Sequence, residues 1–235
     1  MASDGMLLTP AFTPSFTQYC QSIRWDALDD ACAQAKQLFD VAADQLKPKV
    51  LLRECFIDSY DVESGLASVV IEGIRFTGKA LTALAGIHRV LPYIATCGDG
   101  MEGFRLERYD MLAPYWLDML KAQALGCARQ SLRLYCKEAF GWSKPFSLNP
   151  GSGNTDIWPI EQLGGLFTLL GEAGGTHVSG GPGDSGVHLT QSSLMVPNKT
   201  IAGLLFTSKN SDYESCAYCE RTGCPDRRVP FRQKL

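Results

Sequence analysis

At residues 91–100 the chain reads LPYIATCGDG, an apolar run that ends in a glycine-containing turn. A run of this length followed at once by turn formers is typical of a buried β-strand. Downstream, residues 101–140 hold almost no glycine or proline, and their leucines and aromatic residues recur at helical intervals. We expect two helices there, meeting near Ala113 and Pro114, because proline suits the first turn of a helix.

Other segments predict a mixture of helices and strands. Apolar spacing favours helices over residues 26–46, 78–90 and 159–170, and Pro48 ends the first of them. Residues 50–57, 68–76, 186–190 and 200–207 are short, rich in β-branched or aromatic residues, and predict strands. Because these elements do not alternate regularly, the sequence predicts an α+β fold, with one domain over residues 1–210 and a cysteine-rich tail over 211–235.

The composition excludes several classes of protein. The 235 residues include 22 Lys+Arg and 25 Asp+Glu, a formal net charge of −3, so we expect no nucleic-acid partner. The apolar stretch 157–170 is interrupted by Glu161, Gln162 and a glycine pair, whereas a membrane span needs about 20 apolar residues. Residues 1–17 lack the basic and apolar regions of a secretory signal. We therefore expect a cytoplasmic protein with no membrane segment.

The motif GPGDSG at residues 181–186 satisfies two familiar patterns without their context. Its glycine spacing suits a dinucleotide loop, but it precedes a predicted strand where such a loop follows one and opens a helix. It also contains the GDSG of trypsin-like proteases, yet a triad needs a base and an orienting acid. His88 falls in a predicted helix, and His177 and His188 do not form a metal-ligand pair at helical spacing. We reject both interpretations.

Three of the nine cysteines lie close together near the C-terminus, at Cys216, Cys219 and Cys224. Two residues between the first pair allow both sulfurs to face one tetrahedral ion or one cluster, and neighbouring arginines would favour thiolates. A fourth ligand from another cysteine would suit structural zinc or a closed cluster. The alternative is an exposed tail with unligated thiols. We predict a metal site at these three cysteines.

Several short motifs occur together in a family's order over about residues 70–207. They are FTGK at 76–79, ATCG at 95–98 with Glu102, SLNPG at 147–151, WPIEQ at 158–162, LFTLL at 166–170, GVHLTQS at 186–192 with Met195 and Pro197, and TIAG at 200–203. In this order the chain resembles the activation domain of cobalamin-dependent methionine synthase. The three-cysteine tail is similar to that of stand-alone relatives.

The resemblance implies a twisted antiparallel sheet with helices packed on it. It also implies that S-adenosylmethionine binds and that the domain docks over a corrinoid, where cobalt(II) is reduced by one electron and trapped by methyl transfer. Carried over by motif, the candidate cofactor-binding residues are Asn149, Pro150, Gly151, Trp158 and Glu161. Because the chain has no Asp-x-His-x-x-Gly motif for cobalt ligation, the cobalamin would be held mainly by a partner protein.

Two positions depart from the family's adenosylmethionine loop. The loop normally opens with arginine and has tyrosine directly after Pro-Gly, whereas this chain has Ser147 and Ser152. The change removes a charged donor fork suited to the methionine carboxylate. S-adenosylmethionine binding is therefore the weakest part of the resemblance.

Two functions follow as hypotheses. The first is a stand-alone activator of a corrinoid-dependent methyltransferase, with S-adenosylmethionine as methyl donor and an iron–sulfur cluster at Cys216, Cys219 and Cys224 as electron donor. The second is a non-enzymatic module that binds or assembles a corrinoid protein and holds structural zinc at the same cysteines.

Overall fold

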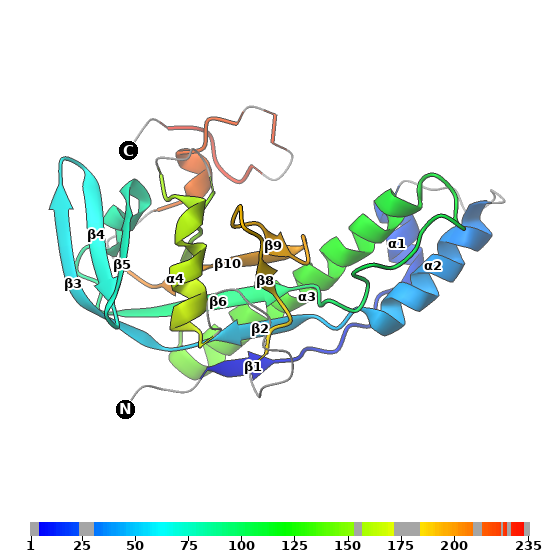
Figure 1. Ribbon diagram of the computed structural model, residues 1–235, viewed down its shortest axis with the longest axis horizontal. Helices are drawn as coiled ribbons and strands as arrows, with labels where there is room; N and C mark the ends of the chain where they lie inside the picture. Colours follow the sequence, from blue (N-terminus) through cyan, green and yellow to red (C-terminus); the bar gives the residue numbers. More distant parts are fainter. Residues whose placement is uncertain are drawn as a thin grey trace.

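The structure is a computed structural model that describes residues 5–23, 31–152, 157–171, 184–208, 213–221, 223–224 and 227–232. Figure 1 shows an elongated molecule with β-hairpins at one end, helices at the other and a sheet between them. The fold is α+β, as the sequence predicts.

The sheet has eight antiparallel strands and is organised around β6. One branch contains β1 (Met6–Leu8), β2 (Lys49–Leu52), β6 (Arg89–Thr96), β10 (Thr200–Phe206) and β7 (Phe146–Leu148). The other continues from the start of β6 through β3 (Cys55–Glu63), β4 (Leu66–Ile71) and β5 (Ile74–Gly78). A separate hairpin joins β8 (His188–Leu189) and β9 (Met195–Val196). Strand β6 is therefore the element on which the rest of the sheet assembles.

Helices cover both faces of the sheet. The long helix α3 (Ala113–Phe140) packs on the face that carries Leu91 and Tyr93, while α4 (Leu163–Leu169) packs on the face that carries Val90 and Ile94. The alternation follows from the two-residue period of a strand. At the far end, α1 (Phe16–Ser22) and α2 (Ala31–Gln45) pack with the start of α3. Both faces of β6 are therefore buried.

Several predicted elements are confirmed. The apolar run at 91–97 lies in β6, and the proposed helix at 159–170 corresponds to a 3₁₀ turn (Ile160–Gln162) followed by α4. The described part of the helix expected at 26–46 is α2, which ends three residues before Pro48. The predicted strands at 186–190 and 200–207 contain β8 and β10. These segments have the clearest apolar periodicity or the clearest turn signals.

Three predictions about helices and strands are wrong. The segment 78–90 contains a 3₁₀ helix at Lys79–Leu84 and then enters β6, so His88 lies in an exposed connection and not in a helix. Residues 101–112 form turns, and the two expected helices are one, α3, with Pro114 in its first turn. The strands expected at 50–57 and 68–76 are four, because the chain also turns at 53–54 and at 72–73.

The C-terminal segment contacts the domain. Tyr213 joins the same buried cluster as α4, and its ring stacks on Tyr218 with centroids 5.5 Å apart. Ala217 is also buried. The boundary predicted at residue 210 falls outside the described residues and stays a prediction. No helix in the described part of the chain is long and apolar enough to cross a membrane.

Buried thiols predict how stability depends on pH. Cys55, Cys97 and Cys136 are fully buried, and burial raises their pKa values to about 12, about 11 and about 11. The unfolded chain releases these protons near the ordinary thiol pKa, while the folded chain keeps them. The free energy of unfolding should therefore fall between about pH 9 and pH 11, by up to about 1.4 kcal/mol per pH unit for each thiol. Urea unfolding across this range measures the slope.

A Cys136→Ala variant is the matched control for this pH dependence. It should show a shallower decline than the parent protein, because one of the titrating groups is gone. A parent profile that is flat from pH 8 to pH 11 would contradict the prediction.

Candidate functional site

Two of the sequence motifs meet in the folded chain. Trp158 is fully buried, and its indole packs edge-on against Phe76 of β5 with ring centroids 6.0 Å apart. Gln162 adds polar contacts, since its amide accepts from the Thr77 backbone N–H at 2.9 Å and donates to the Thr77 carbonyl at 2.7 Å. The Trp158 indole N–H donates to the same side-chain oxygen at 3.1 Å. The start of α4 is thereby fastened to β5.

Gly78 permits this close approach. A Cβ atom at this position would lie 2.7 Å from the Ile157 carbonyl oxygen, closer than real Cβ contacts allow. The Ala80 backbone N–H donates to that carbonyl at 3.0 Å. The glycine in the FTGK motif is therefore needed for packing against the WPIEQ motif.

The candidate cofactor-binding residues lie on one loop and the turn that follows it. Asn149 and Pro150 come directly after β7, and the Gly151 N–H donates to the Trp158 carbonyl at 2.8 Å. This bond joins the two ends of the loop, at Gly151 and Trp158. Residues 153–156 of the loop lie outside the described part. Pro150 and Trp158 are buried, while Glu161 is exposed. The structure thus brings these five residues into one region.

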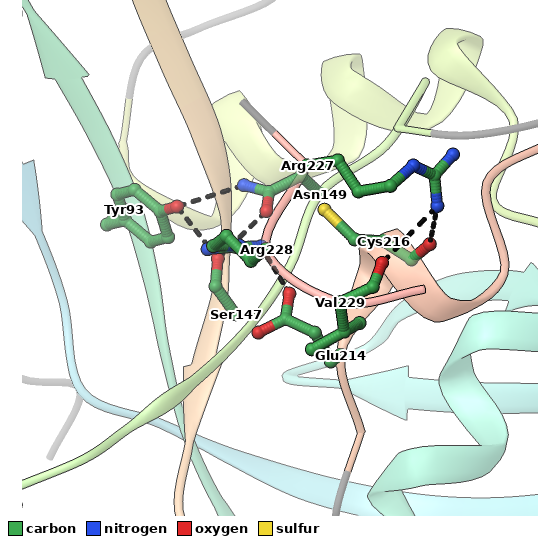
Figure 2. A network of polar contacts seen from close by, with 8 residues as sticks. All are labelled: Tyr93, Ser147, Asn149, Glu214, Cys216, Arg227, Arg228 and Val229. Carbon is green, nitrogen blue, oxygen red and sulfur yellow. Dashed lines mark hydrogen bonds and ion pairs between the residues drawn. The ribbon is translucent and has the colours of Figure 1, made fainter. Parts of the chain in front are cut away.

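A closed ring of hydrogen bonds anchors the start of the loop (Figure 2). The Asn149 amide nitrogen donates to the Tyr93 hydroxyl at 2.9 Å, and the Ser147 hydroxyl donates to the Asn149 side-chain oxygen at 2.9 Å. The hydroxyls of Tyr93 and Ser147 are 2.9 Å apart, so the remaining proton, that of Tyr93, goes to Ser147. The second amide proton of Asn149 goes to the Ala202 carbonyl at 2.8 Å. Every side-chain proton of the ring is used.

The environment keeps the tyrosine of this ring protonated. Burial raises the pKa of Tyr93, and this outweighs the lowering by its bonds to Ser147 and Asn149 and by the positive charges of Arg129 and Arg228. The phenol therefore acts as a neutral hydrogen-bond donor at physiological pH. Through its hydrogen bonds to Tyr93 and Ala202, Asn149 fixes the position of the start of the loop.

Gly203 makes room for the ring. It lies opposite Tyr93 in the register of β6 and β10. A Cβ atom at 203 would lie 2.5 Å from the Asn149 amide nitrogen and 2.1 Å from the Leu148 carbonyl oxygen. Any side chain there would separate β7 from β10. The glycine of the TIAG motif is therefore required for the ring to close.

The three C-terminal cysteines do not form a ready ligand set. Cys216, Cys219 and Cys224 are partly buried free thiols. Within the described residues, no three His, Cys, Asp or Glu side chains come together in a group that could hold a metal ion. The predicted iron–sulfur or zinc site at these cysteines has no support in this geometry, and we derive no chemical step from it.

An arginine organises this segment. The Arg227 guanidinium donates to the carbonyls of Cys216 at 2.8 Å, Cys219 at 2.8 Å and Arg221 at 2.6 Å. The turn is thus closed around a guanidinium whose three shorter bonds, and a fourth at 3.4 Å to the Val229 carbonyl, all go to backbone acceptors. Charge-assisted hydrogen bonds of this kind are about twice as strong as neutral ones.

Comparison with solved structures finds a crystal structure of the MetH reactivation domain bound to AdoHcy. The TM-score is 0.54 and the sequence identity is 13%, over 91% of this chain and 82% of that chain. The chain has the fold of the MetH reactivation domain. No protein-family description and no curated protein sequence matches it.

The reactivation-domain fold accounts for the order of the sequence motifs, since FTGK, SLNPG, WPIEQ and TIAG all meet around β5, β6, β7 and β10. The first half of the rejected motif, residues 181–183, lies outside the described residues, as does His177. His188 lies on β8. Sequence reasoning gave no role to Tyr93 or Gln162, and it considered Arg227 only as a charge near the three cysteines, whereas its guanidinium bonds to backbone carbonyls. For Tyr93 the available signal was a hydroxyl within the apolar run at residues 90–95.

Opening the ring should destabilise the fold. Asn149→Ala leaves the buried Tyr93 hydroxyl and the Ala202 carbonyl each without a donor, and should lower the free energy of unfolding by about 1–3 kcal/mol. Urea unfolding measures the change. Lys144→Gln alters an exposed residue just before β7 and should change stability by less than about 0.5 kcal/mol. Equal stability of Asn149→Ala and the parent would contradict the role given to the ring.

Removing the Arg227 guanidinium should loosen the C-terminal turn. Arg227→Gln loses most of the bonds to three carbonyls, and hydrogen exchange at residues 216–221 should accelerate at least about tenfold, the equivalent of about 1.4 kcal/mol. Arg221→Gln is the matched control, because only the backbone of Arg221 takes part. If exchange is unchanged in Arg227→Gln and instead accelerates when the parent is treated with a metal chelator, a metal holds the turn.

Proposed function

We propose that the protein activates a corrinoid-dependent methyltransferase by binding an S-adenosylmethionine-type ligand and docking onto a partner protein that carries the corrinoid. The observation that carries this proposal is the fold match over 91% of the chain to a MetH reactivation domain bound to AdoHcy. The meeting of four family motifs around one loop supports it.

The reacting groups in this proposal are the sulfonium of the methyl donor and the cobalt of the partner's corrinoid. The methyl carbon of a sulfonium donor is transferred to the partner's corrinoid after a low-potential one-electron donor has reduced cobalt(II) to cobalt(I), and S-adenosylhomocysteine is released. The work left to this chain is to hold the sulfonium donor in a fixed orientation and to exclude water from it. A rigid loop is suited to this, because fixed geometry lowers the entropic cost of the transfer.

The loop and its supports divide this work. We assign the ligand-facing role to Gly151 and the exposed carboxylate of Glu161, whose negative charge would attract a sulfonium. Pro150 is buried and supports the loop from the protein side. Trp158 and Asn149 act as positioning residues, since one is buried against Phe76 and the other is closed into the ring. The electron comes from a separate low-potential donor protein, so the proposal requires no cluster on this chain.

Calorimetric titration with S-adenosylhomocysteine and S-adenosylmethionine tests the first half of the proposal. We expect both to bind at micromolar to millimolar concentration, with one site per chain. Glu161→Gln should weaken S-adenosylmethionine more than S-adenosylhomocysteine, because only the former carries a positive sulfonium.

An anaerobic activation assay tests the second half. The cobalamin-binding part of a methionine synthase, loaded with cob(II)alamin, is mixed with this protein, titanium(III) citrate and S-adenosylmethionine. The cobalt(II) paramagnetic signal should disappear, with one S-adenosylhomocysteine formed per cobalt, and omission of this protein should leave no S-adenosylhomocysteine formed. Failure of both nucleosides to bind, with a stable complex to the corrinoid protein, would instead establish the non-enzymatic docking module.

A further inference from the structure

The C-terminal segment brings a second arginine to the ring at the start of the loop. Arg228 forms an ion pair with Glu214, and Figure 2 shows this pair in one polar network with Tyr93, Ser147 and Asn149. Its positive charge lies close enough to lower the pKa of Tyr93, against the larger effect of burial. The Arg228 side chain is 53% exposed, so it is accessible to a ligand from solvent. The charge of Arg228 therefore acts on the ring at the start of the loop.

The ring itself cannot bind a carboxylate. Its protons are all used, by ring oxygens and by the Ala202 carbonyl. A carboxylate accepts hydrogen bonds and needs donors that are not already committed. The donors must therefore come from side chains around the ring.

An arginine at position 147 is incompatible with this ring. Residue 147 both accepts from Tyr93 and donates to Asn149, and a guanidinium has no acceptor. A chain that keeps the ring therefore has no guanidinium at this position. Arg228 is charged and lies nearby, and Arg129 on the exposed side of α3 adds a second positive charge near Tyr93.

We propose that Arg228 binds the carboxylate of the amino-acid end of an S-adenosylhomocysteine-type ligand, exchanging its partner Glu214 for the ligand. This inference rests on the proposed function and names the residue that recognises one end of its ligand. The guanidinium fork is suited to a bidentate bond with a carboxylate. Glu214 keeps the guanidinium paired when no ligand is present, and so competes with the ligand.

The neighbouring residue keeps Arg228 in place. Arg227 is bonded to the carbonyls of Cys216, Cys219 and Arg221, which fixes the backbone from which Arg228 projects. The Arg232 backbone N–H donates to the Ala217 carbonyl at 2.8 Å and closes the segment on its other side. The C-terminal turn is thereby a scaffold for one ligand-binding side chain.

Titration with two nucleosides tests the inference. S-adenosylhomocysteine carries the amino-acid carboxylate, and 5′-methylthioadenosine lacks the whole amino-acid end. Arg228→Gln should lower the affinity for S-adenosylhomocysteine about tenfold and leave that for methylthioadenosine unchanged. Glu214→Gln should raise the affinity for S-adenosylhomocysteine several-fold, again with no effect on methylthioadenosine. Arg221→Gln, in the same turn, should change neither.

The possible results separate the inference from the proposed function. If the parent protein binds neither nucleoside, the proposed function fails and the inference fails with it. If it binds both but Arg228→Gln weakens both equally or neither, the inference alone is overturned. Hydrogen exchange shows whether Arg228→Gln disturbs the turn. If it does, Glu214→Gln still tests the inference. Unchanged or weaker binding of S-adenosylhomocysteine in Glu214→Gln would show that the ligand does not replace Glu214 as the partner of Arg228.

Discussion

The closed hydrogen-bond ring of Tyr93, Ser147 and Asn149 is the interaction on which the candidate site depends. It joins β6, β7 and the loop across β10, where Gly203 leaves the necessary space. A buried polar network is favourable when every member is satisfied and costly when one is not. The loop therefore has one favourable position, and the bond from Gly151 to the Trp158 carbonyl fixes its other end.

The parts of the fold that could be predicted from the sequence are those whose apolar residues follow a clear pattern. The strand at 91–97 and the helix after Pro159 show clear apolar patterns, and both are where the sequence places them. The segment 78–90 misleads because its leucines face the core from a 3₁₀ turn, which also brings apolar residues to one side every third position. Strands β1, β7 and β9 are two or three residues long, too short for any period to appear.

In the candidate site, too, some residues could be predicted from the sequence and others could not. The loop residues could be found by motif, because proline restricts the backbone at position 150 and the positive φ of Gly151 favours glycine. The supports could not, since Tyr93 and Gln162 act through contacts between segments about 55 and 85 residues apart in sequence. The arginines near the cysteines carried a clear charge signal, but their partners are backbone carbonyls and Glu214, which the order of residues does not reveal.

Ser147, which stands where the family's loop has arginine, loses a charged donor but supplies the hydroxyl that the ring needs. A serine can donate and accept at once, and this is what lets the buried Tyr93 hydroxyl and the partly buried Asn149 amide be satisfied together. The same choice leaves the loop without a guanidinium at its start. In the assignment proposed above, the positive charge comes from Arg228, on a segment that folds onto the domain through Tyr213 and Ala217. Under that proposal, ligand recognition would be coupled to the docking of the C-terminal segment, so a partner protein that displaced this segment would also change how the ligand is held.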